Sequence, residues 1–286
     1  MMITMFAAAL LQAALPTQTA VKAGTAQAAP ATAIARKSDA PRRLHRVVID
    51  AGHGGVDPGA SMRSSSRIHE KDITLQVSLK LGELLSERGV EVRYTRTRDT
   101  LIALDDRGRI ANEAGGDVFI SIHVNAANPN WRDPSSARGF ETYFLAAART
   151  EDARRVEALE NESVRFESDQ PVAEDDPLGF ILSDMMQNEH LRESSDLAEI
   201  VQKHLGKVHP GPSRGVKQAG FRVLVNSFMP AVLVELGFGT NKAEAAFLSS
   251  QTRQRALARA VADATMEYLE RYDRRVGGGS ASSVHE

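Results

Sequence analysis

The sequence predicts an α/β domain with a mostly parallel, twisted sheet flanked by helices. From Arg46 onward, short apolar runs rich in β-branched residues alternate with longer stretches of helical periodicity, an order typical of parallel strands joined by helical crossovers. The chain has 286 residues, of which 42% are hydrophobic. That length suffices for one domain with a sizeable core and is long for two ordinary ones. We therefore expect a single domain.

Four short apolar runs are expected to form strands. Each is β-branched or alternating in character, and each ends in a turn residue or in a side chain capable of chemistry. These runs are 47–49, 90–94, 118–123 and 231–234.

Three segments are expected to form helices. Residues 73–81 are ambiguous, because their apolar positions alternate like a strand and also fit a helix face. A helix over 73–88 is favoured, since it ends before Gly89 and supplies the crossover that parallel strands require. Residues 103–113 and 251–272 complete the set.

The two ends of the chain are expected to lie outside the domain, which we place at residues 42–273. Residues 5–16 are apolar but too few to cross a bilayer, and they resemble the core of an export signal. The first basic residue is Lys22, so a misplaced start codon or an unprocessed leader are alternatives. Residues 17–41 and 274–286 predict a flexible leader and a disordered tail. We expect a periplasmic or secreted protein with no transmembrane anchor in the mature chain.

Residues 149–196 differ in charge from the rest of the chain. They hold fourteen acidic and five basic residues, a net charge of −9, and since the whole chain carries −2 the remainder carries +7. Two helices, 150–167 and 178–191, are expected here, separated by a loop over 169–177. The segment predicts an acidic helical insert that serves as a lid or docking surface.

The amino-acid composition limits which catalytic groups, metal ligands and partners are available to this protein. Cysteine is absent, which excludes thiolate ligands, cysteine nucleophiles and disulfides. A net charge of −2 and a pI near 6.5 give no reason to expect a nucleic-acid partner. Any metal would be bound by His, Asp or Glu.

A glycine-rich loop follows the first predicted strand, where open α/β sheets place their ligand sites. Its sequence is Asp-Ala-Gly-His-Gly-Gly over 50–55. This spacing matches neither of the nucleotide-binding motifs GxGxxG and GxxxxGK(S/T), and the lysine of the second motif is absent. In the alternative interpretation, His53 is a metal ligand whose imidazole projects above the edge of the sheet. A lone histidine is more often structural than a ligand, so this interpretation needs companions.

Those companions are expected at the same edge. His123 ends the predicted strand 118–123, and Glu70 stands at the entry to the helix after the His53 loop. Two imidazoles and a carboxylate suit one Zn²⁺ ion in a hydrolase, with a fourth position for water. Glu235 ends the run 231–234 and would be the proton acceptor.

Five blocks of the sequence resemble the zinc-dependent N-acetylmuramoyl-L-alanine amidases of bacterial cell-wall remodelling: VVIDAGHGGVDPGA, HEKDITL, TRTRDTLIALDDRGRIAN, VFISIHVNA and AVLVELGF. The resemblance runs from about Arg46 to Tyr272. It implies an enzyme that cuts the amide between N-acetylmuramic acid and L-alanine in peptidoglycan, in wall remodelling or cell division. It also implies that His53, Glu70 and His123 bind zinc and that Glu235 is catalytic. His69 is the rival ligand.

Some relatives in this family carry an insertion whose helix covers the zinc until an activator protein removes it. The resemblance therefore implies autoinhibition by the 149–196 insert, with Glu160 as the candidate inhibitory ligand. The stretch 180–186 is apolar and rich in Met, so it would be the docking face for the activator. A solvated acidic helix is the simpler interpretation. We expect a monomer.

Three questions stay open at this level. The arginines of residues 95–112 could bind substrate or tie their own loop together, and Trp131 could contact a sugar or anchor its loop. A zinc carboxypeptidase or endopeptidase, and a wall-binding module with a degenerate site, are the alternative functions.

Overall fold

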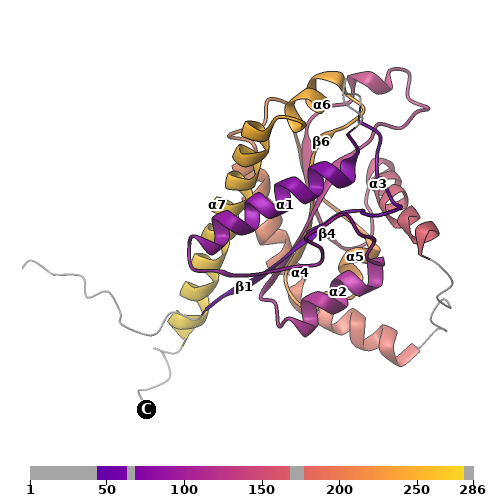
Figure 1. Ribbon diagram of the computed structural model, residues 1–286. Helices are drawn as coiled ribbons and strands as arrows, with labels where there is room; N and C mark the ends of the chain where they lie inside the picture. The colour runs from indigo at the N-terminus through magenta and orange to yellow at the C-terminus, as the bar shows by residue number, and fades with distance from the viewer. Residues whose placement is uncertain (1–43, 63–67, 168–176, 280–286) are drawn as a thin grey trace, which may run out of the picture. The chain divides into compact units, whose positions relative to one another are not determined.

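The computed structural model describes residues 44–62, 68–167 and 177–279. Six strands form one sheet in the order β2-β1-β3-β6-β4-β5 (Figure 1). All neighbouring strands are parallel except β4 and β6, which are antiparallel. The expected mostly parallel sheet is therefore confirmed. The strands are β1 (Arg46–Ala51), β2 (Glu91–Tyr94), β3 (Val118–Asn125), β4 (Phe140–Leu145), β5 (Ser213–Ala219) and β6 (Ala231–Phe238).

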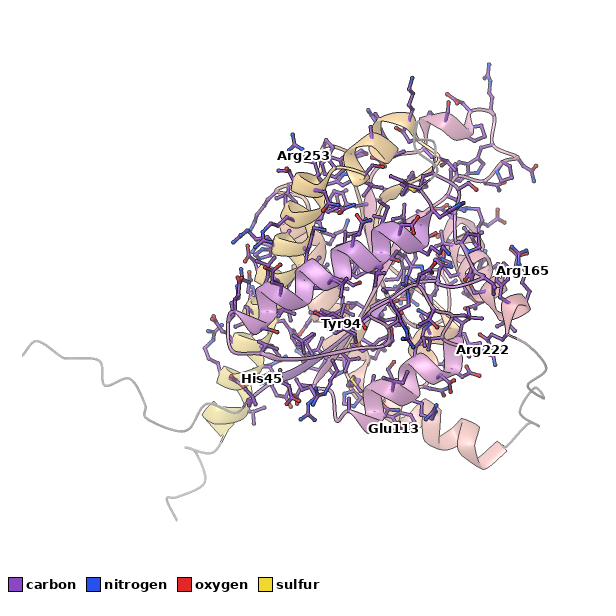
Figure 2. All side chains as sticks on the ribbon, in the orientation of Figure 1. His45, Tyr94, Glu113, Arg165, Arg222 and Arg253 are labelled. Carbon is purple, nitrogen blue, oxygen red and sulfur yellow. The ribbon has the colours of Figure 1, made fainter. Side chains whose placement is uncertain are left out.

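Helices cover both faces of the sheet, and side chains fill the layers between them (Figures 1 and 2). One face packs against α1 (Glu70–Ser86), α4 (Pro177–Leu205) and α7 (Gln251–Gly279). The other packs against α2 (Leu104–Glu113), α3 (Glu151–Asn161) and α5 (Arg222–Val225). Helix α6 (Lys242–Leu248) follows β6, and two 3₁₀ turns span Pro134–Ser136 and Glu162–Phe166.

Side chains alternate between the two faces along each strand. In β3 and β6, Ile122 and Val234 belong to the core on the α1 side, while Phe119 and Leu233 belong to the core on the α3 side. By the same alternation, His123 and Glu235 stand on the α3 face. The register also pairs these two residues on neighbouring strands.

The predicted elements correspond to β1, β2, β3 and β6 and to α1, α2 and α7. The choice of a helix over 73–88 is confirmed by α1. Two strands, β4 and β5, and two short helices, α5 and α6, were not predicted.

The predicted limits of the insert and tail differ from the structure. The second insert helix is part of α4, which runs to Leu205 and buries Leu197 and Val201 in the core, so residue 196 lies inside a core helix. Helix α7 continues to Gly279, past the predicted boundary at 273, and Arg275 pairs with Glu193 of α4 at 2.5 Å. The leader 1–41 lies outside the described residues, as does nearly all of the loop 169–177. No described helix is long and apolar enough to span a membrane.

Candidate metal centre

His53 stands in a strained loop directly after β1. Its φ of 61° makes it the one non-glycine residue with positive φ in the described part of the chain, and such a conformation persists only where surrounding contacts enforce it. Asp57 supplies one of them, through a 2.7 Å hydrogen bond between Nδ1 of His53 and Oδ2 of Asp57. That bond directs Nε2 away from Asp57 and toward the centre of the site.

Glycine allows the second histidine to lie against this loop. A Cβ on Gly52 would come within 2.4 Å of the ring of His123, so any larger residue would push the imidazole out of place. Glu70, the first residue of α1, is oriented by two backbone N–H groups, those of Val124 at 2.7 Å and Ala60 at 2.8 Å. The Glu70 carboxylate is thus held from two directions, while the His123 ring packs directly against the backbone of Gly52.

The three predicted ligands meet at one point. Oε1 of Glu70 lies 3.1 Å from Nε2 of His53 and 3.2 Å from Nδ1 of His123. Glu160 from α3 joins them, with Oε2 at 3.2 Å from His53 and 2.9 Å from His123. All four residues are buried, and their ligand atoms lie within 4.8 Å of one another.

Unpaired polar atoms in this group fit a metal cation. Among the described residues, Nε2 of His53, Nδ1 of His123 and Oε2 of Glu160 are buried without a hydrogen-bond partner, an arrangement that proteins otherwise avoid. Two imidazoles and two carboxylates around one point are the donors that a divalent transition metal prefers. The residues present therefore fit one metal ion.

The electrostatics indicate the same demand for positive charge. Burial lowers the pKa of His53, but Glu70, Asp57 and Glu160 outweigh it and raise this pKa well above its ordinary value. Burial likewise opposes the protonation of His123, yet Glu160 and Glu70 raise its pKa to about 9. The carboxylates thus hold protons on the imidazoles where a cation would otherwise balance their charge.

Glu235 lies beside this group on β6. It is fully buried, and neither of its carboxylate oxygens has a hydrogen-bond partner among the described residues. Burial raises its pKa well above the ordinary value, and the charges of Glu160, Glu70 and Glu141 raise it further. A carboxylate with a raised pKa and unused oxygens is suited to accept and release a proton.

Two arginines of residues 95–112 brace the His53 loop. Arg107 donates to the carboxylate of Asp50 at 2.9 Å and to the backbone carbonyl of His53 at 3.0 Å. Arg96 donates to the carbonyls of Ala51 and Gly52, both at 2.8 Å. Both are buried, so their contacts support the structural interpretation over a substrate-binding one.

Two other predicted candidates lie outside the group. His69 is the N-cap of α1, where its backbone N–H donates to Asp72 at 2.9 Å, and it is not among the four clustered residues. Trp131 packs against a small cluster that includes Phe238 and lies 5.2 Å below the guanidinium of Arg155 in α3. Its contacts are those of a partly buried anchor.

A charged network beside Glu235 was not predicted. Glu141 of β4 is the register partner of Glu235, and it is fully buried. Its carboxylate accepts from Arg214 and Lys217 of β5 at 2.9 and 2.5 Å. Because neither β4 nor β5 was predicted, these residues could not be placed at the sheet edge from the sequence alone.

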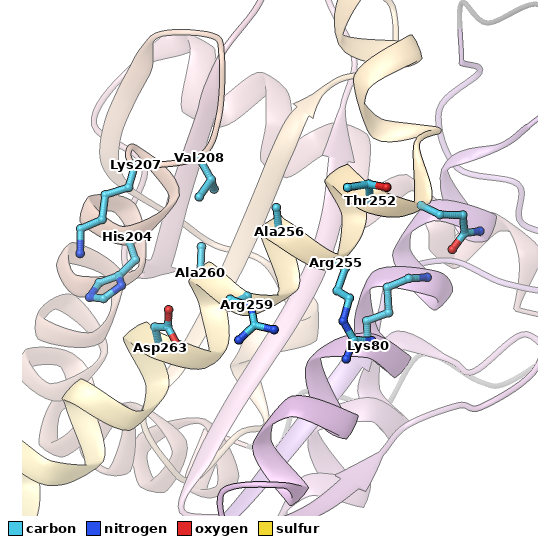
Figure 3. Close-up of a pocket in the computed structure, with 11 residues that line it drawn as sticks. Lys80, His204, Lys207, Val208, Thr252, Arg255, Ala256, Arg259, Ala260 and Asp263 are labelled. Atoms are coloured by element: carbon cyan, nitrogen blue, oxygen red, sulfur yellow. The ribbon is translucent and has the colours of Figure 1, made fainter.

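One hollow in the described structure lies away from this centre. It measures about 650 Å³ and lies between α1, α4 and α7 (Figure 3). Its lining includes Lys80, His204 and Arg259, and none of the predicted site residues.

The fold and the site together are those of a hydrolase with a buried donor set for a metal at the carboxyl edge of an α/β sheet. The sequence profile of the N-acetylmuramoyl-L-alanine amidases matches residues 47–267. The chain belongs to this family.

Individual relatives agree with this assignment. The chain is 33% identical over 230 residues to the N-acetylmuramoyl-L-alanine amidase AmiA of Escherichia coli, covering 79% of this chain and 77% of that protein. It is similar to the crystal structure of an N-acetylmuramoyl-L-alanine amidase from Clostridium difficile, with 30% identity, a TM-score of 0.59, and coverage of 79% and 97%. The chain is also similar to the structure of the CwlD amidase from Clostridioides difficile in complex with the GerS lipoprotein. The sequence identity is 26%, the TM-score is 0.58, and the match covers 79% of this chain and 98% of that chain.

Proposed function

We propose that this amidase cleaves the bond between N-acetylmuramic acid and L-alanine in peptidoglycan with one Zn²⁺ ion held by His53, Glu70 and His123. The observation that carries the proposal is the convergence of these three side chains, with their ligand atoms within 4.8 Å of one another, beside the unpaired carboxylate of Glu235. Membership of the amidase family supports the bond that is cut.

Glu235 is the proton carrier in this proposal. Zinc, when bound, would act as a Lewis acid that lowers the pKa of water to about 7. Glu235 accepts the proton of the attacking water, whose oxygen joins the carbonyl carbon of the scissile amide. Glu235 then returns the proton to the alanine nitrogen as the C–N bond breaks. The products are a lactyl carboxylic acid on the sugar and a peptide with a free amino group.

We also propose that α3 restrains the enzyme in the described conformation. Glu160 lies 2.9 Å from His123 and 3.2 Å from His53, and in this proposal its carboxylate takes the place of water and substrate at the metal. Such a helix would have to be displaced, and the insert 149–196 would be the docking site for an activator protein. The complex of the relative CwlD with a lipoprotein supports a protein partner. The stretch 180–186, whose side chains lie outside what the structure describes, remains the proposed docking face.

Localisation and processing belong to the same proposal. Peptidoglycan lies outside the cytoplasmic membrane, so the chain would act in the periplasm or after secretion. Residues 1–41 would serve as export signal and leader, and residues 42–273 as the catalytic domain, with α7 extending that domain to Gly279. The chain would act as a monomer.

Digestion of purified cell wall tests this function. The zinc-loaded enzyme should release stem peptides with a free N-terminal alanine, identified by mass spectrometry, and metal analysis should find one zinc per chain. Glu235→Gln should bind zinc normally and lose at least about a hundredfold in kcat, the scale of a general base. His53→Ala should lose zinc.

The products also separate this enzyme from its alternatives. Peptides cut at an internal bond would indicate an endopeptidase or carboxypeptidase. Absence of zinc together with intact wall would indicate a binding module. Wild-type turnover by Glu235→Gln would refute its assignment as the base.

A further inference from the structure

Four charged groups form a closed set next to the metal centre. Arg214 and Lys217 of β5 each donate to two carboxylates, one from Glu141 of β4 and one from Asp152 of α3. These four groups are two cations and two anions, and Arg155 of α3 adds a third cation that pairs with Asp152. The carboxylates differ in one respect: Glu141 belongs to the sheet, whereas Asp152 belongs to the insert.

Glu141 is a permanent part of this set. It is fully buried, and Asn125 and Tyr143 donate to its second oxygen at 2.6 and 2.9 Å. Its bonds to Arg214 and Lys217 therefore hold the two cations in place. The rings of Phe238 and Tyr143 lie 5.0 and 5.8 Å from the charges of Arg214 and Lys217, which further fixes their orientation.

Asp152 is the replaceable member. It accepts from Arg214 and Lys217 at 2.8 Å each through Oδ2, and its side chain is 24% exposed. Arg155, which lies 3.3 Å from its other oxygen, belongs to the same helix and would move with it. Displacement of α3 would leave two cations facing one buried carboxylate, a site with net positive charge.

The spacing of the two α3 carboxylates matches the spacing of their partners on the sheet. Asp152 and Glu160 are eight residues apart on one helix, about 12 Å at 1.5 Å per residue. Strands β3 and β5 are three positions apart in the sheet, about 14 Å at roughly 4.8 Å per strand. One carboxylate of α3 thus lies at the metal centre while the other lies at the β5 cations.

We propose that Arg214 and Lys217 form a subsite for a carboxylate of the substrate's stem peptide, and that Asp152 occupies this subsite while α3 covers the site. The proposal rests on the proposed function, which makes the substrate a peptide that carries carboxylates. At about 3.3 Å per extended residue, a separation of about 12 Å corresponds to a carboxylate about four residues from the scissile amide. Helix α3 would then mimic two features of the substrate, its reacting group and its charged peptide.

A pair of substrates tests the proposal. One is a synthetic muramoyl peptide with free peptide carboxylates, and the other is the same compound with those carboxylates amidated. The wild-type enzyme should show a kcat/KM at least about tenfold higher for the free acid, since hydrogen bonds to charged groups are the strong ones. Lys217→Gln and Arg214→Gln should bring the ratio close to one, mainly through a higher KM for the free acid.

Controls separate recognition from folding. Lys217→Arg keeps the charge and should keep the preference. Arg222→Gln removes an arginine that pairs with Asp105 instead, and it should leave the ratio unchanged. Activity on the amidated substrate shows that each variant is folded and competent.

Two results would refute the proposal that Arg214 and Lys217 form a carboxylate subsite. One is a wild-type enzyme that cleaves both substrates equally well, and the other is a Lys217→Gln variant that loses activity on both in proportion. Failure of both the wild type and Glu160→Ala, in which the carboxylate that contacts the two histidines is removed, to cleave either substrate would instead refute the proposed function itself.

Discussion

Single residues decide whether the metal centre can form, and Asp50 is the clearest case outside the ligand set. It is the next-to-last residue of β1 and is fully buried. Its carboxylate accepts from Arg107 at 2.9 Å, Thr95 at 2.6 Å and Ser121 at 2.6 Å. Arg107 also holds the carbonyl of His53. The pair thus connects the β1 strand to the loop that presents the first imidazole.

Asp50→Asn should destabilise the protein by about 3–5 kcal/mol, because it leaves the buried Arg107 guanidinium without its counter-charge. Urea unfolding at pH 7 measures this loss. A change below about 1 kcal/mol would show that Arg107 is adequately bound by backbone carbonyls alone.

Asp50→Asn should also change how the free energy of unfolding depends on pH. Burial raises the pKa of Asp50, but Arg107 and the hydroxyls of Ser121 and Thr95 outweigh it, so the pKa is lowered. A lowered pKa stabilises the folded state above the ordinary value of about 3.9, and that stabilisation is lost as pH falls below it. The wild-type free energy of unfolding should therefore fall more steeply below about pH 4 than that of Asp50→Asn.

At the scale of elements, sequence patterns predicted the strands that carry the proposed ligands and missed their neighbours. The apolar runs of β1, β3 and β6 are visible because their centres are buried on both faces. In β5 the sequence SRGVKQA is polar and only its last residue is buried, so no pattern marks it. Glu141 in β4 looks like a surface residue, and only tertiary contacts reveal that Arg214 and Lys217 neutralise it.

Helix α3 is the element whose role can be tested by one substitution. Glu160→Ala removes the carboxylate from the two histidines and should raise basal hydrolysis severalfold, because the approach to the metal is opened. Glu162→Ala is the matched control, since Glu162 is exposed and pairs with Arg165 in the adjoining turn. Equal basal rates of hydrolysis for the wild type and Glu160→Ala would refute the proposal that α3 restrains the enzyme. A point substitution is preferable to deleting 149–196, which would cut through α4.

For the whole molecule, the sequence predicted the fold class and the convergence of His53, Glu70 and His123, because parallel strands bring their carboxyl ends to one edge. It could not settle which residue of the insert lies nearest that point. Glu160 was named from a family resemblance, and the structure places it against both histidines.

Removal of the metal should lower the thermal stability of the whole domain. The three proposed ligands come from different elements, so an ion bound by them would stabilise the folded state by RT ln(1 + [L]/Kd). Chelation should lower the melting temperature by several degrees, and zinc should restore it. His53→Ala should show no zinc-dependent shift. A wild-type melting temperature insensitive to chelator would contradict the proposed ligand set.

The distribution of the site along the chain bears on how the enzyme matures. His53, Glu70 and His123 all come from the uninterrupted stretch between β1 and β3, whereas Glu235 arrives on β6, in the middle of the finished sheet. During synthesis from the N-terminus, the three proposed metal ligands are translated before the proposed proton acceptor. With the proposed roles, a chain truncated before β6 would keep the three ligands but lack the general base, and we expect it to bind metal without hydrolysing the cell wall.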